Sequence, residues 1–265
     1  MAQPAREVKS IQRAIVEVLS AQLSVHDSAT AYKTGSSIIL NASQHAHAKF
    51  LTKLDFSSFF PSINAATIAR LLRASIRGIQ DSDVTFVLDA CLWYGDGEHA
   101  LCVGAPSSPL LSNAAMYEFD VAASQVALAS GCTYTRYSDD ISISAQAPDL
   151  LSGVEQQIRV ICRGMNYPNL VFNEEKRVAV GRGAAMRVTG LTLANDGAVT
   201  VGRLRKRGAR AGVKNFLAGH MSLDRVDELK GELAFVLSVE PQYRDVLVST
   251  YGHRIAELLP RQRDL

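Results

Sequence analysis

The sequence lacks the features of a secreted, membrane-spanning or disulfide-stabilised protein. It has four cysteines in 265 residues, and Cys91, Cys102, Cys132 and Cys162 show no paired spacing, so we expect buried free thiols rather than disulfides or zinc ligands. No hydrophobic run is long enough to span a bilayer, and the first residues lack the apolar core of a signal peptide. With 47% hydrophobic residues, the chain can bury a substantial core, and we expect a cytoplasmic protein.

The chain as a whole also lacks a large charge excess. The formal net charge is only +2, which by itself argues against a dedicated nucleic-acid binder. Residues 176–214 nevertheless contain ten Lys or Arg against the single acid Asp196, which gives +9 in this segment and −7 in the rest of the chain. This segment predicts a contact with a phosphate backbone, and a solvated charged surface is the alternative.

The spacing of apolar residues predicts alternating helices and strands. Helical spacing covers residues 8–23, 67–76, 84–93, 107–128 and 151–162 and resumes at 223. Strands are expected at 50–56, 100–103, 133–137, 140–144, 170–172 and 178–180, and a hairpin is expected at 187–201 around the turn signal Asn195-Asp-Gly197. This order favours an α+β fold with helices packed on one face of a sheet.

Three acidic residues lie at the ends of predicted strands. Asp139 and Asp140 are adjacent between two runs of β-branched and aromatic residues, where their like charges repel each other. Asp55 ends a half-buried strand in which Lys53 shares its face. An ordinary solvated turn would also account for the Asp pair. If the three carboxylates meet across a sheet, they form a site of the kind that holds two Mg²⁺ ions about 4 Å apart for phosphoryl transfer in polymerases.

Six segments resemble, in their order along the chain, the motifs of reverse transcriptases of the bacterial retron type. They are Asn41-Ala-Ser-Gln-His45, Leu54-Asp-Phe-Ser-Ser-Phe-Phe-Pro-Ser-Ile63, Gly104-Ala-Pro-Ser-Ser-Pro-Leu-Leu-Ser-Asn113, Tyr137-Ser-Asp-Asp140, Asn173-Glu-Glu-Lys176 and Val188-Thr-Gly190. The second and fourth resemble the first acidic motif and the catalytic box, the third the template-contacting motif and the fifth the lysine motif. The first and last are similar to the two signatures of the retron branch.

The resemblance implies an RNA-directed DNA polymerase with a right-hand α+β fold. Residues 1–49 would form a residual fingers segment, 50–200 the palm with interleaved fingers helices, and 201–265 a helical C-terminal thumb. Two Mg²⁺ ions, or Mn²⁺ in their place, would be the cofactor. The implied reaction copies a structured non-coding RNA into a short single-stranded DNA from an RNA 2′-hydroxyl. The resulting RNA-DNA hybrid would serve antiphage defence with a separate effector protein.

The resemblance also implies roles for individual residues. Asp55, Asp139 and Asp140 would be catalytic, and they would bind metal together with the carbonyl of Phe56. The implied nucleotide-binding residues are Phe59, Phe60, Ser107 and Lys176. The implied template- or primer-binding residues are Asn41, His45, Gly104, Pro106, Ser108, Arg203, Arg205, Lys206, Arg207, Arg210 and Lys214.

Some of these residues have a second interpretation. Phe60 is the implied gate against a ribose hydroxyl, and plain core packing is its alternative. Lys176 is a candidate partner of the incoming triphosphate or of the catalytic acids. His45 and His47 are two residues apart and would not share a helix face. For His45 we therefore favour a polar contact that holds Asn41 or the backbone over metal binding.

The sequence departs from the family pattern at three places, the least important of which is Ser138 at the tip of the hairpin. A fingers hairpin with a basic residue is usual before the segment corresponding to Pro4, so we expect a truncated start or another basic residue in that role. Cys102-Val103 precede Gly104, where the family often has Pro-Gln. The rival interpretations are another bacterial reverse transcriptase, of the intron-encoded or abortive-infection kind, and a non-catalytic RNA-binding scaffold that keeps a polymerase-like fold.

Overall fold

The computed structural model describes residues 4–95 and 97–260. The helices are α1 (Arg6–Leu19), α2 (Ile38–Gln44), α3 (Ala65–Ser75), α4 (Asp81–Cys91), α5 (Ser108–Ala115), α6 (Tyr117–Ala129), α7 (Pro148–Gly164), α8 (Arg203–Leu217), α9 (Leu223–Val239), α10 (Tyr243–Tyr251) and the 3-10 turns η1 (Glu174–Lys176) and η2 (His253–Leu258). The strands are β1 (Phe50–Ser57), β2 (Trp93–Gly95), β3 (Glu98–Ala100), β4 (Thr133–Tyr137), β5 (Asp140–Ala145), β6 (Val171–Phe172), β7 (Val178–Gly181), β8 (Arg187–Val188), β9 (Leu191–Leu193) and β10 (Val199–Thr200). Residues 1–3 of the predicted fingers segment and residues 261–265 of the predicted thumb lie outside the described residues.

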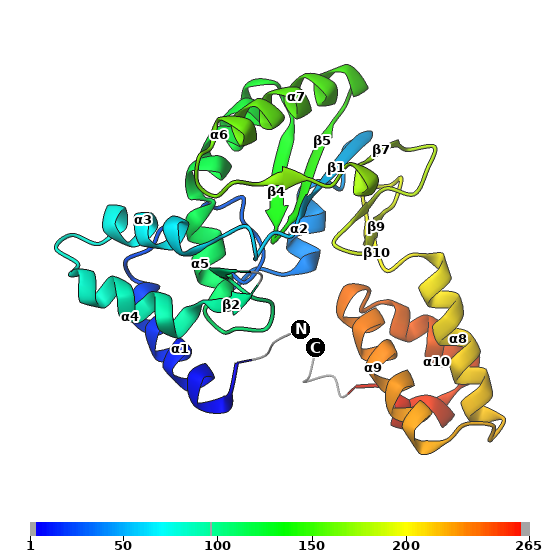
Figure 1. Cartoon of the computed structure of the whole chain (residues 1–265). Coiled ribbons are helices and arrows are strands. Elements are labelled where there is room, and N and C mark those ends of the chain that lie inside the picture. Colours follow the sequence, from blue (N-terminus) through cyan, green and yellow to red (C-terminus); the bar gives the residue numbers. More distant parts are fainter. Residues whose placement is uncertain (1–3, 96, 261–265) are drawn as a thin grey trace.

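An antiparallel sheet in the order β4, β5, β1 forms the centre of the fold (Figure 1). The second edge of β1 pairs with β7 along its first half and with β6 at its end. Helices α6 and α7 pack on one face of this sheet, and their apolar side chains form a core with Leu54, Ile141 and Ile143. The predicted α+β fold is confirmed.

The opposite face of the sheet is also buried, which the alternation of residues in β5 did not predict. The hydroxyls of Ser142 and Ser144 alternate with Ile141 and Ile143, a pattern typical of a strand with one face in solvent. Instead both serines are buried, because α2 and the residues after it lie against this face. The polar residues of β5 therefore face a hydrogen-bonded interface within the protein and not the solvent.

The structure corrects three of the predicted elements. The single helix expected over 107–128 is two helices, because Met116 leaves helical geometry with φ −90° and ψ 1°. Both helices face the same core, so the apolar spacing continues across the break. The strand expected at 100–103 lies earlier in the chain, because β3 ends at Ala100 and residues 101–103 are not in a strand; Asp96, between β2 and β3, lies outside the described residues. The hairpin expected at 187–201 has three strands, because Thr189 and Gly190 form a further turn with positive φ.

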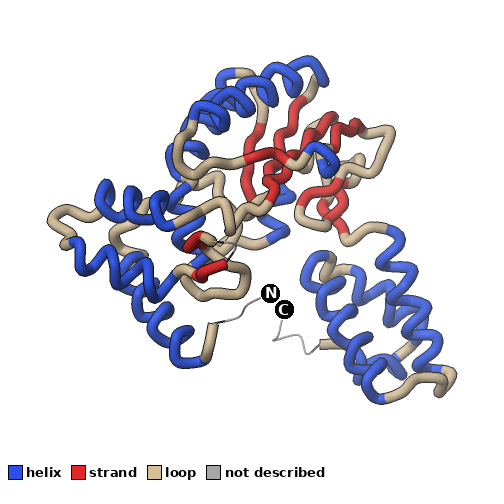
Figure 2. The backbone as a smooth tube through the Cα atoms, in the orientation of Figure 1, coloured by secondary structure: helices blue, strands red, loops and turns tan. Residues whose placement is uncertain are grey.

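The chain after β10 is helical, as predicted, and forms a bundle of α8, α9 and α10 beside the strand-bearing part (Figure 2). Its core of Leu233, Val236, Leu237 and Leu247 continues into the β8–β10 sheet. Leu51 of β1 belongs to this second core, whereas Leu54 of the same strand belongs to the first. All four cysteines are free; three are buried and Cys102 is half-buried. Within the described ranges, every helix is too short or too polar to cross a membrane.

Candidate active site

The three predicted catalytic acids lie at one end of the central sheet. Asp55 of β1 is directly opposite Asp140 of β5 in the antiparallel register. Ser138 and Asp139 form the two-residue turn between β4 and β5, and the amide of Phe56 donates a hydrogen bond to the Asp139 carbonyl at 3.2 Å. The Asp55 side chain is buried, while Asp139 and Asp140 are half-buried. Residues 84 positions apart in the sequence are thus neighbours at the sheet end.

Two lysines contact this acidic group. The Nζ atom of Lys176 lies 3.0 and 3.2 Å from the two carboxylate oxygens of Asp55, and Nζ of Lys53 lies 3.5 Å from Asp140. Lys176 reaches Asp55 because the Asn173 amide donates to the Asp55 carbonyl at 2.8 Å, which anchors η1 beside β1. Of the two partners predicted for Lys176, the structure shows the contact with one of the predicted catalytic acids, Asp55. The pKa of Lys176 is raised, chiefly by its hydrogen bond to Asp55.

The carboxylates are close enough to influence one another. Burial raises the pKa of Asp140, the charges of Asp139 and Asp55 raise it further, and Lys53 opposes the shift. Hard carboxylate oxygens with mutual repulsion are suited to Mg²⁺, which is held by one or two carboxylates together with substrate phosphates rather than by a closed protein cage. Within residues 4–95 and 97–260, no three His, Cys, Asp or Glu side chains form a group that could hold a metal ion, and Asp55 and Asp140 are instead paired with Lys176 and Lys53. The fit to a divalent cation therefore concerns the kind of donor, carboxylate oxygen, and the facing register of Asp55 and Asp140.

The structure assigns four of the predicted contact residues to the interior. His45 is fully buried, and its Nδ1 and Nε2 atoms lie 2.7 Å from Ser144 Oγ and 2.8 Å from Thr135 Oγ1. Asn41, Ser107 and Ser108 are also buried. Their side chains are thus enclosed by protein, and the contacts of Asn41, His45 and Ser108 with template or primer, and of Ser107 with the nucleotide, stay predictions. The polar contact favoured for His45 exists, but its partners are the two strands of the hairpin.

The two phenylalanines after Asp55 differ in exposure. Phe59 is buried and stacks on Phe56 with ring centroids 5.9 Å apart, which is core packing, and the nucleotide contact predicted for it stays a prediction. Phe60 is half-buried, and its ring meets Phe59 edge-on at 5.4 Å. Gly104, with φ 88°, and Pro106 are accessible. Phe60, Gly104 and Pro106 thus keep the surface that their predicted contacts need.

The basic residues of α8 divide into two sets. Arg205 lies 3.6 Å from Glu232, and Lys206 lies 2.8 Å from Glu240, so both are held by α9 and the residue after it. The remaining four follow one another at intervals of four, three and four residues and therefore share a helix face. This exposed set, the α8 stripe, consists of Arg203, Arg207, Arg210 and Lys214, and no ion pair involves it within the described chain.

Several residues of the site were not predicted from the sequence. Lys53 had a signal, because strand alternation already placed it on the face of Asp55. Tyr32 had none: its hydroxyl lies 3.4 Å from Ser138 Oγ, and its ring lies 6.5 Å from that of Tyr137. Arg136 also had none, because its partner Asp120 looks like an ordinary polar residue of a helix. Arg136 and Asp120 form a fully buried ion pair at 2.6 Å behind the catalytic turn.

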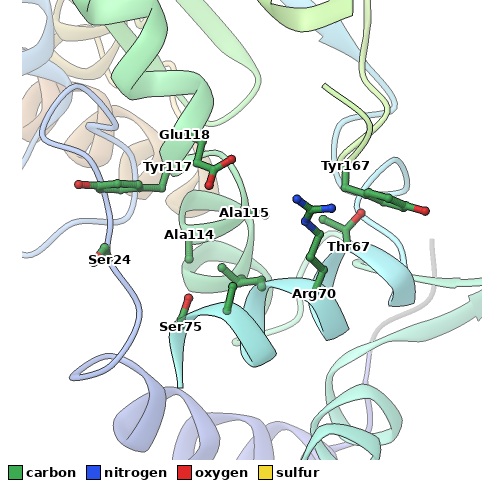
Figure 3. Close-up of a pocket in the computed structure, with 11 residues that line it drawn as sticks. Ser24, Thr67, Arg70, Ser75, Ala114, Ala115, Tyr117, Glu118 and Tyr167 are labelled. Atoms are coloured by element: carbon green, nitrogen blue, oxygen red, sulfur yellow. The ribbon is translucent and has the colours of Figure 1, made fainter. Parts of the chain in front are cut away.

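A separate surface pocket lies away from the acids, between α3 and the junction of α5 and α6 (Figure 3). Arg70, Tyr167, Tyr117 and Glu118 surround it, and the Arg70 guanidinium lies 5.8 Å from the Tyr167 ring centroid. Predicted site residues are not among those that line it. The sheet end is therefore the candidate active site.

Comparisons with known proteins agree with this geometry. Residues 1–193 match the family model described as reverse transcriptase (RNA-dependent DNA polymerase). The retron Ec83 reverse transcriptase of Escherichia coli is 33% identical over 256 residues, which is 95% of this chain and 82% of the relative. The retron Ec86 reverse transcriptase of the same organism is 28% identical over 93% of this chain and 73% of the relative.

Solved structures with a similar fold include telomerases. Telomerase from Candida albicans, in complex with a TWJ fragment of telomeric RNA, superposes with a TM-score of 0.51 at 13% identity over 92% of this chain and 48% of that one. Apo telomerase from Candida tropicalis gives 0.51 at 13% identity over 97% of this chain and 51% of the other. The chain thus spans about half the length of those telomerases, and the likeness concerns the fold.

Fold, acidic sheet end and family match together define the class: the chain belongs to the reverse transcriptase family, whose activity is RNA-directed DNA synthesis. Within that family it is a bacterial reverse transcriptase of the retron type, as the sequence motifs predicted.

Proposed function

We propose that this reverse transcriptase copies a structured non-coding RNA into a short single-stranded DNA, using Mg²⁺ at the end of its central sheet. The observation that carries the proposal is the register of β1 and β5, which sets Asp55 opposite Asp140 with Asp139 in the adjoining turn. A scaffold protein would gain no stability from a group of carboxylates that repel one another.

In this proposal each group at the sheet end has a separate task. Asp55, Asp139 and Asp140, with the Phe56 carbonyl, would hold the metal ions, or Mn²⁺ in their place. The chemistry that two such ions supply is a lower pKa of the primer hydroxyl and neutralisation of the leaving pyrophosphate. Lys176 balances the charge of Asp55 and carries an exposed ammonium for the triphosphate. Phe60 would exclude a ribose 2′-hydroxyl by its bulk.

The nucleic acid would extend from the acids toward α8. Gly104 and Pro106 expose backbone for the template-nucleotide pair, because small residues permit close approach. The α8 stripe would grip phosphates without reading sequence. In this arrangement residues 1–49 act as a residual fingers segment, 50–200 as the palm with interleaved fingers helices, and 201–265 as the thumb.

The retron layer of the proposal rests on similarity to the retron enzymes of Escherichia coli. The template and the primer would belong to one non-coding RNA, and a 2′-hydroxyl of that RNA would start synthesis. The RNA-DNA hybrid would act with a separate effector protein in defence against phage.

The test is extension by the purified chain on its own non-coding RNA, identified from transcripts that co-purify with it. With Mg²⁺ and deoxynucleoside triphosphates, the wild type should give labelled DNA that remains attached to RNA, and Asp139→Asn should give none. Tight RNA binding without extension would indicate the scaffold interpretation. Extension of annealed primers alone, with the RNA by itself inactive, would indicate another kind of reverse transcriptase.

A further inference from the structure

The guanidinium of Arg136 is fully enclosed and has an acceptor at every nitrogen. Its Nε and Nη2 atoms donate to the Asp120 carboxylate at 2.6 to 3.2 Å. Its Nη1 atom donates to Asn113 Oδ1 at 3.2 Å and to the carbonyl of Ser138 at 2.9 Å. Both charged side chains have an exposed fraction of 0%. Arg136 thus connects α5 and α6 to the backbone of the catalytic turn.

The turn that Arg136 contacts has an unfavourable backbone. Ser138 has φ 61°, in the left-handed region that is strained for a residue with a side chain. It is the first residue of a two-residue hairpin turn, a position that often takes glycine because positive φ is needed. The Ser138 carbonyl begins the peptide that leads into Asp139. Its bond to Arg136 therefore fixes the orientation of the peptide that carries a proposed metal ligand.

Arg136 also contacts the segment that follows Asp55. Its guanidinium carbon lies 5.9 Å from the ring centroid of Phe59, and Phe59 supports Phe60. On the opposite side, the backbone of Arg136 pairs with Ser28 and Thr30, and Asn113 donates to the Ala31 carbonyl at 2.9 Å. One side chain thus contacts both catalytic segments and the helices behind them.

The energetics argue for a role beyond stability. A buried ion pair loses its hydration, and an apolar pair of similar volume is often as stable or more stable. Burial, followed by the charge of Asp120, also raises the pKa of Tyr134, whose neutral hydroxyl donates to Asp120 at 2.7 Å. A charged network of this kind is costly to bury but holds its members in one geometry.

We infer that Arg136 is a positioning residue for DNA synthesis: by holding the Ser138 carbonyl, it sets the orientation of the Ser138–Asp139 peptide and so the place of the Asp139 carboxylate relative to Asp55. This inference rests on the proposed catalytic role of Asp139. Displacement of a catalytic group by about 1 Å can cost on the order of a hundredfold in rate.

The experiment measures kcat, the KM for deoxynucleotides and the free energy of unfolding in the full chain with its RNA. Replacing Arg136 alone leaves Asp120 buried without a counter-charge and threatens folding. The main variant is therefore Arg136→Met with Asp120→Asn, which removes both charges and keeps an acceptor for Tyr134. Arg136→Lys is the second variant, because its single ammonium keeps Asp120 paired but lacks the planar fork that reaches Ser138 as well.

Arg182→Met is the control for general loss of backbone support. Arg182 donates to the carbonyls of Ala46, Ala48 and Ala194, at the end of β1 opposite Asp55. It should lower stability and leave kcat unchanged.

We expect both Arg136 variants to lower kcat at least tenfold with little change in KM, although the double variant stays folded. A double variant with kcat within twofold of the wild type, or a loss no larger than that of Arg182→Met at equal stability, would overturn the inference. Failure of the proposed function is a different result, because Asp139→Asn would then retain activity or the wild type would have none.

Discussion

Arg136 and the α8 stripe use the same kind of side chain in opposite surroundings. Arg136 is dry and has its acceptors inside the protein, whereas Arg203, Arg207, Arg210 and Lys214 are exposed and no ion pair involves them within the described chain. From this difference we expect a basic residue to mark a nucleic-acid surface only when its partners lie outside the fold. Of the ten basic residues in 176–214, five have internal partners: Lys176, Arg177, Arg182, Arg205 and Lys206.

The largest effect should come from replacing one of the three acids at the sheet end. It should change the rate of DNA extension but not the affinity for RNA. Asp55→Asn removes one of the facing carboxylates and leaves the α8 stripe intact. We expect the extension rate to fall by about a thousandfold, the scale of losing a group that acts on the transition state, with RNA affinity nearly unchanged. Single-turnover extension and filter binding measure the two quantities. Equal losses in rate and affinity would mean that Asp55 acts in RNA binding.

The second effect concerns the α8 stripe. Replacing all four residues by Gln should reduce the slope of log affinity against log salt by about 3, because each phosphate contact of a single strand contributes about 0.7. This corresponds to a loss of a few hundredfold at 0.1 M salt relative to 1 M.

The double variant Arg205→Gln with Lys206→Gln is the comparison for the stripe. It removes charge from the same helix, but from side chains that α9 and Glu240 already hold. Its slope should change much less than that of the stripe variant. If both slopes fell equally, the division of α8 into two sets would be wrong.

The third effect is a pH dependence of stability from His45. Burial lowers the pKa of His45 to about 4, below the value of about 6.5 in an unfolded chain. Between these pH values the unfolded state binds a proton that the folded state does not, so stability falls as the pH falls through this window. From pH 6.5 to 4.5 this amounts to about 2 to 3 kcal/mol.

Denaturant unfolding of the wild type and His45→Gln at several pH values tests this dependence. The wild type should lose more stability than the variant as the pH is lowered from 6.5 to 4.5. Parallel curves would show that His45 titrates normally in the folded protein.

The smallest expected effect is a difference in stability between variants of two neighbouring residues on α8, Lys206 and Arg207. Lys206 lies 2.8 Å from Glu240, whose other oxygen accepts the Val201 amide at 3.0 Å. Lys206→Met should therefore lower the free energy of unfolding by about 1 kcal/mol, the scale of a typical intramolecular hydrogen bond. The neighbouring Arg207→Met should leave stability unchanged and weaken RNA binding. Thermal melts and binding curves for the two variants would show the reverse pattern if Lys206 faced the RNA.

The sequence predicted the parts of the fold and the site that depend on short-range pattern. Alternation at 50–56 and 133–144 identified the strands that bring Asp55 and Asp140 together, and the motif order identified the family. Helix breaks were missed, because Met116 keeps the apolar spacing of its neighbours. The exposure of individual motif residues was also missed. Ser107, Ser108 and His45 are polar, and only the three-dimensional packing shows that their hydroxyl or ring nitrogens are enclosed.

Long-range partners set a second limit on sequence-based prediction. Nothing local in the sequence connects Arg136 with Asp120 and Ser138, since a charged residue on a strand next to an acidic turn looks solvated. The charge count over 176–214 failed for the same reason, because it cannot separate side chains that pair across the fold from those that face solvent.

Strand β1 is shared by two cores, since Leu51 packs with the helical bundle and Leu54 with the helices behind the acids. Asp55 lies four residues after Leu51. The strand that holds this proposed metal ligand therefore also lies at the boundary between the two hydrophobic cores. Loosening of the α8–α10 bundle would be transmitted along a single extended backbone segment to the reacting end of the sheet. We therefore expect the proposed grip on nucleic acid and the alignment of the acids to be mechanically coupled.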